Sequence, residues 1–118
     1  MFDRNQGEIA RVREERRQIA LQMKALQETI STEVEDGYEQ LTAARVLLET
    51  IEKEMVTEAT DVREITEFSY KRGEASLLEL IDAQRAFNET MESYNEARAE
   101  YARALYFIDS VTGKAVKP

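Results

Sequence analysis

Carboxylates are the side chains in this sequence with the most capacity for chemistry, and they gather in two places. One group is Glu33, Glu35, Asp36 and Glu39, and the other is Glu92, Glu96 and Glu100. Helical spacing could aim several of them at a metal ion, but di-metal helical bundles combine such carboxylates with histidine, and this chain has none. We therefore interpret both groups as solvated helix faces and expect neither a metal site nor a cofactor.

Catalysis lacks the groups that it requires. The sequence contains neither histidine nor cysteine, and it has no glycine-rich loop to hold a phosphate. Two packed helices also enclose no cavity in which a substrate and a general base could meet. The sequence predicts that the protein is not an enzyme and has no catalytic residues.

The net charge of −8 argues against nucleic acid as a partner, because phosphate binding needs a basic surface. Arg11, Arg13, Arg16 and Arg17 form the only basic concentration, and glutamates interleave it. We expect these arginines to form ion pairs along a helix. The sequence has no run of 18 uncharged apolar residues, so it contains no candidate for a membrane-spanning helix.

Long helices dominate the prediction, because the only proline is the last residue and the composition favours helix formers. Asn5 and Glu8 have the spacing of a capping box, which predicts a first helix over about 6–72. Lys71, Arg72 and Gly73 form a C-terminal signal, since cations suit a last turn and glycine suits the left-handed residue after it.

The second helix is predicted over about 77–110, after a tip turn at about 73–76. Ser76 is a candidate N-cap, with Glu79 three residues later, and Thr112-Gly113 is a candidate end. So short a turn makes the two helices antiparallel. The expected fold is all-α, a long two-helix coiled-coil hairpin formed as a single domain by residues 1–118.

Heptad columns indicate which faces pack together. The second helix carries one column of large residues and one of small residues: Leu80, Phe87, Tyr94, Tyr101 and Ile108, beside Ala83, Thr90, Ala97 and Ala104. The first helix carries two: Val34, Leu41, Leu48, Met55 and Val62, beside Ile30, Gly37, Ala44, Ile51 and Ile65. The step from Leu26 to Val34 is eight residues, which predicts straightening or local unwinding there.

The first helix is predicted to be about twice as long as the second. Folding the chain about Gly73 places Ser110 opposite about Asp36 and leaves residues 6–35 without a partner in the same molecule. Apolar residues in this stretch, including Ile19, Met23 and Leu26, would then face water. We expect the isolated chain to self-associate through residues 9–34 as an antiparallel dimer.

Two segments carry a family resemblance. The chain begins with FDRNQGEIARV, and about 60 residues later it reads YKRGEASLLELIDAQRAFNETMESYNEA. Together they resemble the C-terminal periplasmic helical hairpin of TolC-like outer-membrane efflux factors, particularly the heavy-metal-exporting, RND-type branch. The resemblance implies that the chain is a fragment of the periplasmic α-barrel of a larger channel.

The function that this resemblance implies is passive transport. The complete protein would be a homotrimeric duct for solutes exported by an inner-membrane pump through a periplasmic adaptor protein. This segment would lie in the periplasm, and barrel strands outside the chain would make the only contact with the outer membrane. The pump would choose the solute.

The resemblance also assigns roles at the tip. Tyr70, Glu79 and Asp82 are similar in position to residues that close or ring the tunnel entrance. The adaptor-contacting tip would be Arg72, Gly73, Glu74, Ala75 and Ser76. Ala75 departs from the basic or polar residue found there in many drug-exporting members. Simpler explanations stay open: helix capping for Glu79, a solvated first-turn carboxylate for Asp82, and packing on Leu77 or Leu78 for Tyr70.

Two other functions remain open from the sequence. A free-standing coiled-coil scaffold would show the same heptads. A periplasmic adaptor hairpin would also be long, but the tip Arg72-Gly73-Glu74-Ala75-Ser76 lacks the Arg-Leu-Ser type of signature expected of that class. The parent open reading frame would separate the channel from the scaffold.

Overall fold

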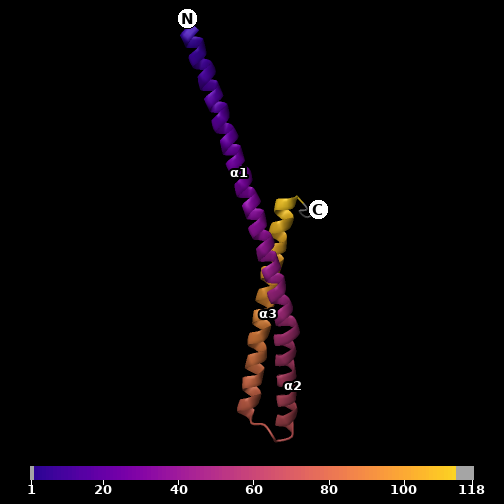
Figure 1. Cartoon of the computed structure of the whole chain (residues 1–118). Helices are drawn as coiled ribbons and strands as arrows, with labels where there is room; N and C mark the ends of the chain where they lie inside the picture. The colour runs from indigo at the N-terminus through magenta and orange to yellow at the C-terminus, as the bar shows by residue number, and fades with distance from the viewer. Residues whose placement is uncertain (1, 114–118) are drawn as a thin grey trace. The chain divides into compact units, whose positions relative to one another are not determined.

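The structure is a computed structural model that describes residues 2–113, and it is helical almost throughout. The elements are α1 (Phe2–Thr50), the π-helical segment η1 (Ile51–Val56), α2 (Thr57–Lys71) and α3 (Leu77–Thr112). Figure 1 shows α2 and α3 joined by a short connection, and both views place them side by side. The predicted all-α helical hairpin is confirmed.

The chain divides into two units, Met1–Asp36 and Gly37–Pro118. In the first unit the described residues are helical, and the side chains of residues 4–33 are exposed. Asn5 lies inside α1, which begins at Phe2, so the predicted start near Gln6 and its Asn5–Glu8 capping box are wrong. Phe2 to Arg4 contain neither proline nor glycine, so no residue before Asn5 stops the helix.

The second unit contains the hairpin, and its core is a narrow seam. The buried apolar side chains there are mostly small: Ala44, Ile51, Ala83, Ala97, Ala104 and Ile108. On α3 both predicted columns face the seam, since each member is buried or half-buried. Alternation of large and small side chains on α3 therefore sets how closely the other helix can approach.

On the helix that packs against α3, the two predicted columns are correct only as far as Ile51. Leu41, Ala44, Leu48 and Ile51 are buried or half-buried, as the heptads require. From Val56, the last residue of η1, the half-buried positions include Ala59, Arg63 and Thr66. Met55, Val62 and Ile65 are instead 44%, 47% and 65% exposed, which corrects the prediction for these three residues.

The π-helical segment explains this shift. A π turn closes i→i+5 hydrogen bonds, one residue more than an α turn, so it acts as a one-residue insertion in the repeat. α1 stays α-helical between Leu26 and Val34, so the helix does not unwind there, and of the two predicted outcomes only straightening remains. The change of helical geometry occurs at Ile51–Val56. A heptad count cannot reveal such an insertion.

Gly37 lies close to α3 at the end of the seam that is farthest from the tip. A Cβ built there would lie 2.7 Å from Cε1 of Phe107 and 3.0 Å from Cδ1 of Ile108. Gly7 is also helical, but a Cβ there would meet nothing within 4 Å. The two glycines therefore form a matched pair for testing the seam.

We predict that Gly37→Ala lowers the thermal unfolding midpoint, whereas Gly7→Ala leaves it unchanged or raises it. Alanine in place of glycine gains about 0.5–1 kcal/mol in a helix interior. At residue 37 overpacking against Phe107 costs about 1–3 kcal/mol, which exceeds that gain. Circular dichroism melts of both variants measure the difference, and equal stabilisation of both would contradict the close approach.

Candidate functional site

The tip of the hairpin contains all the residues to which the sequence assigned a role. The chain leaves α2 after Lys71, crosses Arg72–Ser76 and enters α3 at Leu77. Figure 1 shows this connection as the single turn between α2 and α3. Its geometry is built from two local motifs, one at each helix end.

A Schellman motif ends α2. The amide of Gly73 donates to the carbonyl of Tyr70 at 3.0 Å, and the amide of Glu74 donates to the carbonyl of Ser69 at 2.8 Å. Gly73 has φ of 77°, a left-handed conformation that disfavours residues with a Cβ. The glycine signal in the sequence therefore predicted both the end of the helix and its geometry.

A reciprocal capping box begins α3. The hydroxyl of Ser76 accepts from the amide of Glu79 at 3.1 Å, and Oε2 of Glu79 accepts from the amide of Ser76 at 2.9 Å. The box gives two backbone N–H groups at the start of the helix a partner. The Ser76–Glu79 prediction is confirmed, and capping is the role of Glu79 that the geometry displays.

The charged side chains at the tip are exposed and paired with near neighbours. Nε of Arg72 lies 3.5 Å from Oε1 of Glu74, and the guanidinium lies 5.3 Å from the ring centroid of Phe68. Nζ of Lys71 lies 3.7 Å from Oε1 of Glu67. Pairs this exposed contribute at most about 1 kcal/mol each, so they leave the tip free to exchange partners.

The side chains of Tyr70 and Asp82 take no part in these motifs. Tyr70 is 40% exposed in the last turn of α2, and Asp82 is exposed in the first turns of α3, three residues after Glu79. Leu77 and Leu78 are themselves more than half exposed, so packing on them would bury little of Tyr70. Within one chain the structure links Ser76 to Glu79 and Arg72 to Glu74, and among the described residues no hydrogen bond joins Tyr70 to Asp82.

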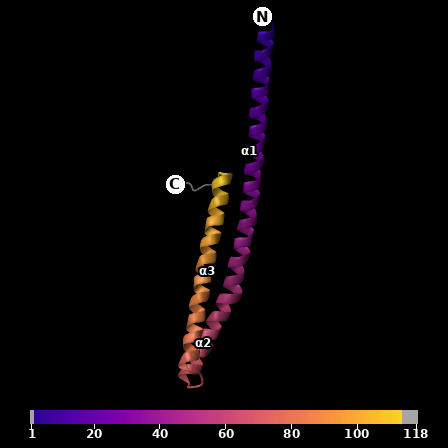
Figure 2. The ribbon, with the colours of Figure 1, turned by 90° about the vertical axis from the view of Figure 1, so that its left-hand side faces the viewer.

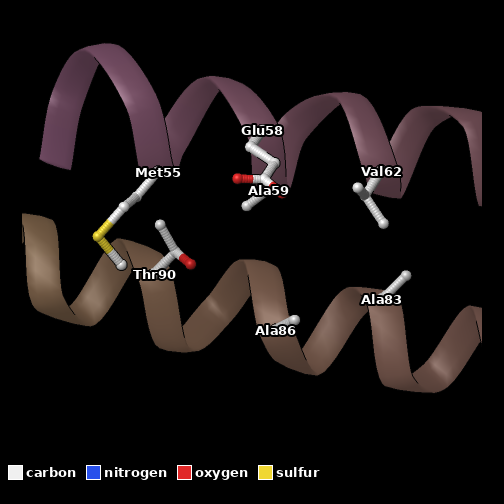
Figure 3. Close-up of a pocket in the computed structure, with 7 residues that line it drawn as sticks. All are labelled: Met55, Glu58, Ala59, Val62, Ala83, Ala86 and Thr90. Atoms are coloured by element: carbon white, nitrogen blue, oxygen red, sulfur yellow. The ribbon is translucent and has the colours of Figure 1, made fainter.

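A shallow groove lies beside the seam, and sequence reasoning missed it. It has a volume of about 220 Å³, and its lining is Met55, Glu58, Ala59, Val62, Ala83, Ala86 and Thr90. Figure 3 shows Met55 extending toward Thr90 and Val62 facing Ala83 across the groove. The one-residue shift at η1 creates it, because that shift leaves Met55 and Val62 beside the seam.

Metal-binding and membrane-spanning features are not found in the part of the chain that the structure describes. No group of three or more carboxylates there could hold a metal ion. No described helix combines the length and apolar character needed to cross a bilayer.

We predict that Gly73→Val destabilises the hairpin and that Gly73→Asn does so less. The left-handed conformation costs a residue with a Cβ about 1–2 kcal/mol, and asparagine tolerates it better than a β-branched residue. Chemical denaturation followed by circular dichroism measures both. Equal stability of the two variants and the parent would show that the left-handed turn is not required.

Comparison with known proteins gave no identification. No family model, curated protein sequence or solved structure matches this chain.

Proposed function

We propose that this chain is the periplasmic tunnel segment of a trimeric outer-membrane efflux channel, a passive duct that receives solutes from an inner-membrane pump through an adaptor protein. The observation that carries the proposal is the tip. The segment YKRGEASLLEL, which resembles the family, folds as a closed turn between two antiparallel helices. A tunnel entrance needs such a turn.

Apolar surface away from the seam supports a wall rather than a free hairpin. Several large side chains of the second unit are 39–64% exposed: Val46, Leu47, Leu105 and Tyr106. Exposed apolar residues in such numbers indicate contact with further protein. In a channel wall, neighbouring helices would cover them.

The roles at the tip follow from the same proposal. Three copies of Glu79 and Asp82 would surround the entrance with carboxylates, and the resulting negative potential would favour cations. The exposed connection Arg72–Ser76 would contact the adaptor. Tyr70 would help to hold the entrance closed.

A coiled-coil scaffold is the second candidate, favoured by the seam itself, which any two-helix coiled coil would share. An adaptor hairpin remains the weaker alternative, because the tip lacks its signature. The two leading candidates differ in one respect: only the channel requires the carboxylates at the tip to act on passing ions.

We predict that Glu79→Gln combined with Asp82→Asn weakens block of the complete channel by multivalent cations. Glutamine can occupy the same position of a capping box, so the fold is kept while two charges per chain are removed. Single-channel recordings in planar bilayers measure conductance and block. The control is Glu92→Gln with Glu96→Gln, two exposed carboxylates of α3 outside the tip. Block that both double variants leave unchanged would refute the charged entrance.

We also predict that the isolated chain self-associates through residues 9–34. Ile19, Met23 and Leu26 are all more than half exposed, so contact between copies would remove apolar surface from water. Sedimentation over a range of concentrations should show a dimer, and Ile19→Glu with Met23→Glu should shift it to monomer. The control is Arg16→Glu with Arg17→Glu, which changes charge in the same helix but removes no apolar side chain. A monomer at every concentration would contradict the prediction.

A further inference from the structure

The seam contains an internal conflict of register at η1. Before this segment the buried positions advance in alternating steps of three and four, through Ala44, Leu48 and Ile51. The same steps would continue to Met55 and Val62. The structure places Val56, Ala59 and Arg63 in the seam instead, one residue later.

The apolar pattern of the sequence favours the other register. Met55 and Val62 continue the heptad column of Leu41 and Leu48. Ile65 continues the neighbouring heptad column, which includes Ala44 and Ile51. In the observed register these three side chains are 44–65% exposed, and the half-buried residues one position later are Val56, Arg63 and Thr66, two of which are polar. Burial of apolar surface alone would therefore draw α2 one residue back.

Each register has a charged residue to accommodate. In the observed one, the guanidinium of Arg63 lies 3.9 Å from the ring centroid of Phe87, a cation–π contact at the seam. In the alternative one, that contact is lost and Glu58 moves from the groove into the seam. Neither arrangement satisfies every side chain, so the two compete.

The change of register requires a rotation of α2 about its own axis. Conversion of the π turn to an α turn rotates α2 by about 100°, the angle between successive helical residues. Met55 and Val62 already face α3 across the groove in Figure 3, and the groove provides about 220 Å³ of space beside the seam. The connection Arg72–Ser76 is exposed or half-exposed, so its side chains do not obstruct the rotation, although the hydrogen bonds of the turn resist it.

We propose that η1 is a one-residue register switch between α2 and α3. In the π register Met55, Val62 and Ile65 lie outside the seam; in the α register they enter it, and Arg63 leaves Phe87. A molecule that covers these three residues binds only the π register and therefore favours it. The switch lies within the hairpin and does not depend on the proposed function.

Engineered disulfides in the full chain distinguish the two registers, because the natural sequence contains no cysteine. Arg63→Cys with Phe87→Cys reports the π register, and Val62→Cys with Phe87→Cys reports the α register. Both pairs lose the same phenylalanine, so they differ only in the residue of α2. Under mild oxidation we expect both pairs to form a disulfide, and Glu58→Ala should increase the yield of the pair at 62 and 87.

Deletion of Lys53 is the matched control. It removes the extra residue of η1, so Ile51 and Val56 fall into one heptad phase and the conflict disappears. In this background we expect the pair at 63 and 87 to oxidise and the pair at 62 and 87 to stay reduced, with helicity unchanged by circular dichroism. The proposal is overturned if the pair at 62 and 87 stays reduced in the parent chain or oxidises equally after the deletion. Failure of both pairs to oxidise would overturn it as well.

Discussion

The close approach of two helices over alanine-sized side chains is the constraint on which this structure depends. Ala83, Ala97 and Ala104 let the opposite helix come near, and Gly37 leaves room for the side chains of Phe107 and Ile108. Such a seam buries little apolar volume, so its strength depends on correct register more than on the amount of surface covered. A slip of one residue would replace small side chains with large ones or with charges.

Two points fix that register independently. Gly37 fixes it in the upper part of the seam, and the Schellman turn at Gly73 with the capping box at Ser76 fixes it at the tip. α3 carries an uninterrupted heptad pattern between them, whereas the opposite helix has one residue more than that pattern accommodates. The π turn at Ile51–Val56 absorbs the extra residue while it keeps the helix continuous. Its location in the middle of the hairpin thus follows from the two ends being fixed.

The sequence predicted those features whose causes are local. The tip could be predicted almost completely, because Gly73, Ser76 and Glu79 act through hydrogen bonds with residues three to five positions away. The columns of α3 could be predicted because a helix with a fixed start keeps its phase. The inward face of α2 could not, since it depends on the opposite helix, and the groove at Met55 and Val62 was missed with it. Tyr70 and Asp82 remain predictions, because no hydrogen bond or ion pair between described residues involves their side chains.

The distribution of hydrogen bonds suggests where this hairpin can move. At the tip several backbone groups of both helix ends are hydrogen-bonded within the turn, so a change of shape there would break several bonds at once. At η1 a change from π to α bonding exchanges one set of backbone bonds for another, and the side chains that compete for the seam lie beside it already. A rotation of α2 therefore requires less rearrangement than an opening of the turn. If the tip closes a tunnel, it moves as a rigid end whose orientation is set farther up the hairpin, and Arg63 on Phe87 is one of the contacts that hold that orientation.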